Sequence, residues 1–283
     1  MKVVLLDGYN LIYRARHARM NKGEYSTVFN FFRSIRPLIE KFDPDLCYFV
    51  LEGKPVQRLS IDPEYKGQRT YHNKDNFSEQ RRSIIRIIKE YFPFVTIRHA
   101  NFECDDVIGH LANVTHKNDN VVIISSDTDF IQSINEYTQV YSPVRKCFLE
   151  KTDYDYVSWK SLVGDKSDNI PKITSVSPAK AKKVISAVHD KFGEGVISLL
   201  DDLNESVINS VVEEIQLINK IKDQDKIDEI REHLLFNIKL TRLSIKVFPD
   251  EIRESLVEFF NDYSVLKFNF REFTNLKNNL SSL

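Results

Sequence analysis

Glycine and long apolar runs are scarce in this chain of 283 residues, and each scarcity excludes a class of protein. The 8 glycines are about 3% of the chain, against an average near 7%. This excludes collagen-like and linker-rich chains, and nucleotide-binding loops that need several glycines. No stretch approaches the roughly 20 apolar residues that span a bilayer, so we expect no membrane partner.

Cysteine is also rare, with 3 residues, Cys47, Cys104 and Cys147, that are far apart and form no CxxC pair. An odd number at this spacing excludes a disulfide framework and a zinc site, and predicts buried, reduced thiols. Asp7 interrupts the first apolar run too early for a signal peptide. We therefore expect a cytoplasmic protein, from a bacterium or a phage-infected cell.

Neither sign of charge is in excess, since 40 Lys and Arg face 41 Asp and Glu, a net charge of −1. Taken whole, this balance argues against a nucleic-acid partner. The charges are, however, unevenly distributed. Residues 1–100 hold 18 basic and 11 acidic residues, a net +7, whereas residues 101–150 hold 3 and 8, a net −5. The near-zero sum hides a basic region followed by an acidic one.

Three short apolar runs each lead into an acid: residues 3–6 into Asp7, 47–51 into Glu52, and 121–124 into Asp127. Such runs are typical of strands buried on both faces. Helical spacing of apolar residues separates them, at 27–42, 78–92 (with Ser78 as the expected N-cap) and 103–115. Alternating strands and helices predict an α/β fold with a parallel sheet, whose ligands bind at the carboxyl ends of the strands.

Beyond residue 153 helical patterns dominate. We expect a boundary near residue 155, which separates an α/β domain at 1–155 from a helical region at 156–283. The helices are expected at 153–163, 178–192, 204–222, 225–241 and 250–261, and the tail from Phe268 stays ambiguous.

Further acids occur in three short groups that suit metal binding. Glu103, Asp105 and Asp106 open a helix, Asp127 and Asp129 leave a strand, and Asp165 and Asp168 follow a helix. Alone, each group has an ordinary explanation as a turn or helix cap. Together they predict one pocket of converging carboxylates, which requires cations for neutralisation. Oxygen-only ligands select Mg²⁺ or Mn²⁺, and two such ions about 4 Å apart suit phosphodiester cleavage.

The motifs LDGYN, YKGQR, ECDDVIG, SSDTDF and LVGDKSDNIP resemble those of the 5′-nuclease superfamily of flap endonucleases and 5′→3′ exonucleases. The resemblance covers about residues 1–190 and is strongest to stand-alone phage and bacterial enzymes and to the nuclease domain of bacterial DNA polymerase I. It implies a free-standing, monomeric nuclease. The implied fold is PIN-like, with a central mostly parallel sheet flanked by helices, a helical arch near 58–90, and a C-terminal helix-hairpin-helix-like (helix-three-turn-helix) element.

The resemblance also implies a metal-binding set that holds two or more Mg²⁺ ions, with Mn²⁺ as a substitute. Its members are Asp7, Glu52, Glu103, Asp105, Asp106, Asp127, Asp129, Asp165 and Asp168. Glu52 departs from the aspartate that the family usually has there.

A second departure lies at 172–181, where the family's hairpin carries glycines that place backbone amides against a duplex phosphate, often with K⁺. Here every expected glycine is Lys or Ser, which leaves the K⁺ site in doubt, and positive φ at Ser175 or Ser177 would cost energy. Side-chain charge could hold duplex phosphate instead, from Lys172, Lys180, Lys182 and Lys183. A solvated basic helix face is the alternative.

Residues 58–89 hold eight basic and four acidic residues with aromatic neighbours, a composition that suits single-stranded nucleic acid. By resemblance this is the arch that a 5′ strand enters. Lys66 and Arg69 would stabilise the scissile phosphate, Tyr65 would stack on a terminal base, and Lys160 would face the active site.

We therefore expect a Mg²⁺-dependent 5′ nuclease that leaves a 5′-phosphate and a 3′-hydroxyl. Its substrates would be DNA with a 5′ flap or free 5′ end, and RNA–DNA hybrids. Two alternatives remain open: a catalytically silent, structure-specific DNA-binding protein, and another Mg²⁺ phosphotransfer enzyme of the Toprim type.

Overall fold

The computed structural model describes residues 1–18, 23–69, 76–193, 204–243 and 247. Within these, the chain folds into two compact units. The α/β unit takes its described residues from Met1–Lys54 and His72–Leu149, and the helical unit takes them from Pro55–Tyr71 and Glu150–Leu243. The helical unit is thus discontinuous in sequence. Residues 55–69 belong to the helical unit. Domains at 1–155 and 156–283 stay a prediction.

The α/β unit is built on a six-stranded sheet of order β3-β2-β1-β4-β5-β6. Its strands are β1 (Lys2–Asp7), β2 (Leu46–Leu51), β3 (Val95–Arg98), β4 (Asn120–Ile124), β5 (Thr138–Ser142) and β6 (Cys147–Phe148). All neighbouring pairs are parallel except β5 with β6. The predicted mostly parallel α/β sheet is confirmed, and the three strands expected from apolar runs are its central members.

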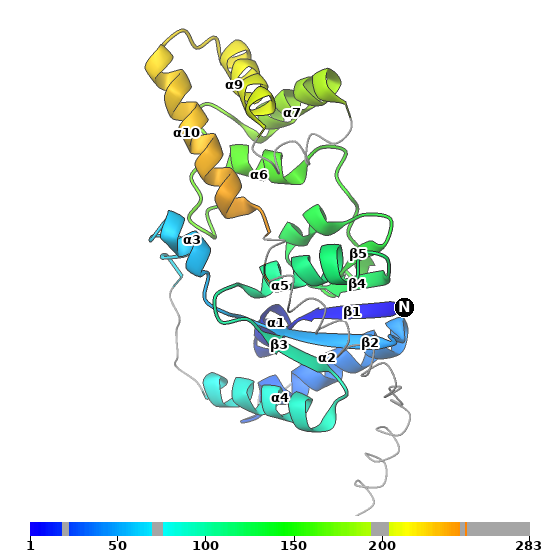
Figure 1. Ribbon diagram of the computed structural model, residues 1–283. Helices are drawn as coiled ribbons and strands as arrows, with labels where there is room; N and C mark the ends of the chain where they lie inside the picture. The colour runs from blue at the N-terminus through cyan, green and yellow to red at the C-terminus, as the bar shows by residue number, and fades with distance from the viewer. Residues whose placement is uncertain (19–22, 70–75, 194–203, 244–246, 248–283) are drawn as a thin grey trace, which may run out of the picture. The chain divides into compact units, whose positions relative to one another are not determined.

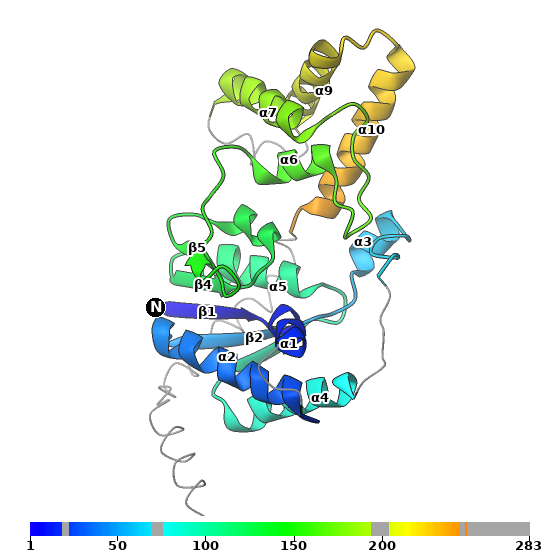
Figure 2. The same ribbon diagram turned by 180° about the vertical axis from the view of Figure 1, so that it is seen from behind.

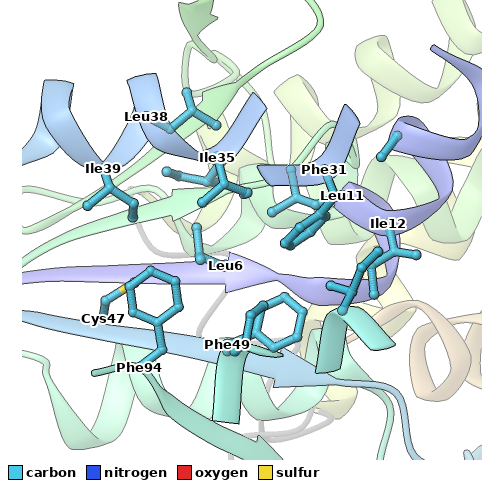
Figure 3. Packing of buried hydrophobic residues seen from close by; sticks show 14 of the residues in the cluster. Leu6, Leu11, Ile12, Phe31, Ile35, Leu38, Ile39, Cys47, Phe49 and Phe94 are labelled. Carbon is cyan, nitrogen blue, oxygen red and sulfur yellow. The ribbon is translucent and has the colours of Figure 1, made fainter. Parts of the chain in front are cut away.

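Helices α1 (Gly8–His17), α2 (Ser26–Phe42) and α4 (Phe77–Tyr91) cover one face of the sheet, and α5 (Cys104–His110) covers the other (Figure 1). Leu6 of β1, Phe31 of α2 and Phe49 of β2 belong to the apolar cluster beneath the first three helices (Figure 3). Burial on both faces is why these strands read as continuous apolar runs.

The structure corrects several details of the sequence analysis. The helix expected at 78–92 begins at Phe77, so Asn76 is its N-cap and Ser78 is not. The helix expected at 103–115 is α5 followed by a π-helical turn, η1 (Leu111–Thr115). Sequence patterns missed β3, β5 and α1, which are short or polar. Cys47 and Cys104 are buried and reduced as expected, but Cys147 is exposed, since it lies on the edge strand β6.

The helical unit contains α3 (Val56–Ile61), α6 (Tyr156–Val163), α7 (Pro178–Phe192), α9 (Glu205–Asn219) and α10 (Gln224–Thr241) (Figure 2). Buried residues of α6, α7, α9 and α10, such as Leu162, Val184, Val211 and Leu234, form its core. The four helices expected between 153 and 241 are therefore present. The helix expected at 250–261 and the ambiguous tail from Phe268 lie outside the described residues. No helix in the described part of the chain combines the length and apolar character that a bilayer span needs.

Candidate metal and nucleic-acid site

Three of the predicted acids lie where neighbouring parallel strands of the α/β unit end. Asp7 is the last residue of β1, Glu52 directly follows β2, and Asp127 follows β4 after two serines. Because β1 pairs in parallel with both β2 and β4, the three strand ends share one edge of the sheet. This is the edge at which parallel α/β sheets bind ligands.

Asp7 is buried, with 4% of its surface exposed, and its side chain caps the first turn of α1. Its carboxylate accepts hydrogen bonds from the Asn10 backbone amide (3.1 Å), the Ser125 hydroxyl (2.7 Å) and the Cys104 thiol (3.6 Å). Burial raises the pKa of Asp7 to about 6; the charge of Asp127 adds to the rise, and the hydrogen bonds oppose it. A nearby cation would relieve this cost.

Two glycines allow the backbones at this edge to approach closely. A Cβ at Gly8 would lie 2.5 Å from the Val50 carbonyl oxygen, and one at Gly53 would lie 1.9 Å from that of His99. The Lys54 amide also donates to the Ala100 carbonyl at 3.0 Å. Although glycine is scarce in this chain, these two positions exclude any side chain.

Helix α5 brings the acids of ECDD to β1 and β2, with which it is in contact. Glu103 is its N-cap and Asp106 lies in its first turn; both are buried, whereas Asp105 is half-buried. Burial raises the pKa of the Cys104 thiol, and the charges of Asp7, Asp105 and Glu52 raise it further. Cys104 therefore lies among three of the predicted metal ligands and keeps its proton at neutral pH.

The two acids of SSDTDF open the 3₁₀ helix η2 (Thr128–Ser133). Asp127 is its N-cap and accepts a hydrogen bond from the Asp129 amide at 2.9 Å. The Asp127 amide donates in turn to the Ser125 hydroxyl at 3.0 Å. Both carboxylates are half-buried, so each still has a face open to solvent or a ligand.

In the helical unit, Asp165 follows α6 and lies beside Lys160. The Lys160 ammonium, on a buried side chain, is 2.7 Å from the Asp165 carboxylate. Burial raises the pKa of Asp165, but the hydrogen bonds and charge of Lys160 and Ser167 outweigh it, so the pKa falls below its usual value. Lys160 therefore holds Asp165 ionised; that Lys160 faces an active site stays a prediction.

Asp168 connects this loop to the YKGQR segment within the same unit. Its carboxylate is 2.6 Å from the Arg69 guanidinium, 3.7 Å from the Lys66 ammonium and accepts the Tyr65 hydroxyl at 3.2 Å. The Lys66 amide, at a left-handed φ of 56°, donates to the Asp168 carbonyl at 3.1 Å. Three residues expected at the nucleic acid thus surround one expected metal ligand. The Tyr65 ring is 5% exposed in this arrangement, so its stacking on a base stays a prediction.

The glycine-free segment at 172–181, which runs into α7, makes its turn with a residue other than glycine. Ser175 adopts a φ of +67°, as a glycine would, while Ser177 has a φ of −81° and caps α7. The Lys180 ammonium donates to the Ser175 carbonyl at 3.3 Å and to the Asn219 side chain at 2.6 Å. A lysine cation therefore lies on this turn.

The other lysines expected to bind duplex phosphate lie on the surface of the helical unit. Lys172, Lys182 and Lys183 are exposed, and the Lys182 ammonium lies 4.5 Å from the centre of the Tyr154 ring. Their role in DNA binding stays a prediction.

A family model described as 5′-3′ exonuclease, N-terminal resolvase-like domain, matches residues 2–161, more than half of the chain. The chain belongs to this 5′-3′ exonuclease family. It is 29% identical to DNA polymerase I of Lactococcus lactis subsp. lactis over 237 residues, which cover 73% of this chain but only 25% of that protein. The chain thus spans about a quarter of the length of that relative.

Two further proteins match along nearly their whole length, one by sequence and one by structure. The 5′-3′ exonuclease of Mycoplasma genitalium is 25% identical over 300 residues, covering 92% of this chain and 99% of that one. The bacteriophage T5 flap endonuclease, crystallised with DNA and metal ions, has a TM-score of 0.68 at 19% identity, covering 93% of this chain and 99% of that one. The second likeness confirms the fold.

The acids that this 5′-3′ exonuclease family member gathers in its α/β unit suit hard divalent cations. Asp7, Asp105, Asp127 and Glu52 supply carboxylate oxygens, and Cys104 retains its proton, so the donors are the oxygens that Mg²⁺ and Mn²⁺ prefer. Burial raises the pKa of Asp7 and the charge of Asp127 raises it further, and a bound cation would oppose both effects.

Sequence reasoning missed two polar residues that hold these acids. Ser125 and Asn10 both make hydrogen bonds to Asp7, and Asn10 also accepts from the Ser126 amide at 3.2 Å. Both lie inside the motifs SSDTDF and LDGYN, so the signal was present. Their side chains are uncharged, and only the charged residues of these motifs indicated metal binding.

Proposed function

We propose that this chain is a metal-dependent 5′ nuclease that cleaves phosphodiesters near the 5′ ends of DNA. One observation carries the proposal: at the shared end of β1, β2 and β4, Asp7 interacts with Asp127, and Cys104 interacts with Asp7, Glu52 and Asp105, in a chain that belongs to the 5′-3′ exonuclease family. The names of the Mycoplasma genitalium exonuclease and the T5 flap endonuclease support this activity, and the T5 complex supports DNA and metal ions as ligands.

Bound Mg²⁺, with Mn²⁺ as a substitute, would supply a water nucleophile at neutral pH and offset charge on the leaving oxygen. In the α/β unit, the acids proposed to hold the ions directly or through water are Asp7, Glu52, Glu103, Asp105, Asp106, Asp127 and Asp129. From the helical unit we propose Asp165 and Asp168 as further ligands. Glu52, one methylene longer than the family's usual aspartate, keeps the charge.

The basic residues of the helical unit are proposed to act on the substrate phosphate. Lys66 and Arg69 contact the Asp168 carboxylate, and Lys160 contacts that of Asp165. The cationic group of each of these three residues therefore faces a carboxylate. A phosphate offers the same oxygen acceptors, and Arg69 can bind it through two parallel hydrogen bonds. We propose that Lys66 and Arg69 stabilise the scissile phosphate and that Tyr65 contacts the terminal base.

Duplex DNA is proposed to bind the helical region, residues 156–283, through Lys172, Lys180, Lys182 and Lys183. These contacts would read the phosphate backbone, so specificity is for structure, such as a 5′ flap or a free end. RNA–DNA hybrids are proposed as further substrates, with removal of flaps and primers as the cellular role. The products would carry a 5′-phosphate and a 3′-hydroxyl.

The test replaces Asp127 and Asp129 together by asparagine and follows cleavage of 5′-labelled flap, nicked and single-stranded DNA with and without Mg²⁺. We expect the double variant to cleave at least about 100-fold more slowly, because metal binding and charge stabilisation are lost. Glu136→Gln is the matched control, since it neutralises an exposed acid on the loop before β5. Full activity of the double variant would contradict the proposal.

The same assay separates the nuclease from a silent DNA-binding protein. Tight flap binding by the wild type, with no cleavage in Mg²⁺ or Mn²⁺, would replace the proposed activity with binding alone. The family match over residues 2–161 argues against a Toprim-type enzyme.

A further inference from the structure

A single buried hydroxyl connects two of the acids at the candidate metal site. Ser125 is 0% exposed; its Oγ donates to Asp7 Oδ2 at 2.7 Å and accepts the Asp127 amide at 3.0 Å. The hydroxyl has one proton to donate and lone pairs to accept, so both contacts form at once. Ser125 therefore fixes the Asp7 side chain relative to the backbone of Asp127.

The sheet itself puts Ser125 in this position. In the parallel pairing of β1 with β4, Leu6 lies opposite Ile124, so the next residues, Asp7 and Ser125, follow side by side. The Ser125 amide also donates to the Tyr141 carbonyl at 3.3 Å, which anchors it to β5. The hydroxyl is thus carried by a rigid backbone.

A second tether runs parallel to the first. The Asn10 amide donates to Asp7 Oδ1 at 3.1 Å, and the Asn10 side-chain oxygen accepts the Ser126 amide at 3.2 Å. Ser125 and Asn10 thus each hold one of the two oxygens of Asp7. Oδ1 also accepts the Cys104 thiol at 3.6 Å. Since each carboxylate oxygen has about two acceptor sites, Oδ2 keeps one of them for a cation.

We propose that Ser125 is a positioning residue for divalent-metal binding. It holds the Asp7 carboxylate and the start of the Asp127–Asp129 turn in one geometry, against the repulsion between these acids. The inference rests on the proposed function, because it concerns the same metal-binding acids. Without the hydroxyl, Asp7 loses the donor on Oδ2 and the Asp127 amide loses its acceptor, so the Asn10 tether is left to hold the two acids together.

The test measures Mn²⁺ binding by electron paramagnetic resonance on the full-length, DNA-free protein. Hydrogen-bonded partners of metal ligands typically contribute about 10- to 100-fold in affinity, so we expect Ser125→Ala to bind Mn²⁺ at least about 10-fold more weakly than the wild type. Ser126→Ala is the matched control: its hydroxyl is buried and makes no hydrogen bond among the described residues. We expect wild-type affinity from that control, and thermal unfolding without metal shows that both variants are folded at the temperature of the titration.

A double-mutant cycle tests whether Ser125 acts through Asp7. Asp7→Asn weakens Mn²⁺ binding by itself, and adding Ser125→Ala should then cost less than about 2-fold, because the carboxylate that Ser125 orients is gone. A full 10-fold further loss would overturn the inference, as would wild-type affinity in Ser125→Ala. Failure of the wild type to bind Mn²⁺ would overturn the proposed function as well, so the two failures are distinguishable.

Discussion

At the residue scale, Ser175 adopts a backbone conformation that favours glycine. Its φ of +67° lies in the left-handed region, which costs a residue with a side chain about 1–2 kcal/mol. The Ser175 side chain is exposed, and its carbonyl is held by Lys180. The surroundings of Ser175 therefore stabilise its left-handed conformation, which serine by itself does not prefer.

Ser175→Gly is expected to stabilise the helical unit. Relief of the left-handed strain exceeds the entropy that glycine adds to the unfolded chain, so the free energy of unfolding should rise by about 0.5–1 kcal/mol. Urea unfolding followed by the fluorescence of Trp159, the only tryptophan of the chain, gives the measurement.

Thr174→Gly, one residue earlier at an exposed position with a negative φ, is the control and should lower the stability by about 0.5–1 kcal/mol. Equal losses in both variants would show that Ser175 carries no strain.

At the element scale, the turn that precedes α7 is held by a cation of α7 itself, Lys180. Asn219 of α9 donates through its Nδ2 to the Ile215 carbonyl at 2.9 Å, which turns its oxygen toward Lys180. The Lys180 ammonium therefore has two fixed acceptors from two elements. A carbonyl oxygen that already accepts an ammonium is a poor ligand for a second monovalent cation.

Binding of flap DNA is accordingly expected to be the same in K⁺ and in Na⁺ at equal ionic strength. Fluorescence anisotropy with a labelled flap and Ca²⁺ in place of Mg²⁺ measures the affinity without cleavage. We expect the ratio of the two dissociation constants to stay within about 2-fold, whereas 10-fold tighter binding in K⁺ would show that a potassium site exists.

Lys183→Met serves as the matched variant for Lys180→Met on the same helix. If Lys183 contacts a phosphate as proposed, its loss should lower the slope of log affinity against log salt by about 0.9. Lys180→Met should in addition lower the stability of the helical unit, because the Ser175 and Asn219 acceptors lose their donor.

At the scale of the whole molecule, the helical unit joins segments that are distant in sequence. Arg58 of α3 is buried and donates to the Leu240 and Arg242 carbonyls at 2.9 Å each, across more than 180 residues. These carbonyls end α10, where backbone acceptors have no partner within the helix. The same segment carries Tyr65, Lys66 and Arg69, so Arg58 anchors the part of the chain that contacts Asp168.

Arg58→Met is therefore expected to lower the free energy of unfolding of the helical unit by about 3 kcal/mol, since two charge-assisted hydrogen bonds are lost. Trp159 fluorescence in urea measures the effect, and Gln57→Met, at an exposed neighbouring position, should change it by less than about 0.5 kcal/mol. A stability loss no larger than that of the control would mean that the anchor contributes nothing.

The central strands, most helices and the acids at the strand ends could be predicted because they depend on local periodicity. Residues 178–192, for example, repeat apolar side chains at helical spacing and form α7 with the same bounds. Helix α1 was missed because Asp7 belongs to an apolar strand pattern and also caps the helix that follows at once. Because Asp7 both ends β1 and caps α1, no separate residue in the sequence marks the start of the helix.

By itself, the sequence determined the class of fold, the family, and which residues carry negative charge beside a parallel sheet. The tertiary structure decided which groups meet: Ser125 with Asp7, Lys180 with Asn219, and Arg69 with Asp168. The physical reason is that the periodic burial of side chains depends on residues that are close in sequence, whereas a hydrogen bond between distant segments depends on strand register and loop path. Those follow only from packing the whole chain.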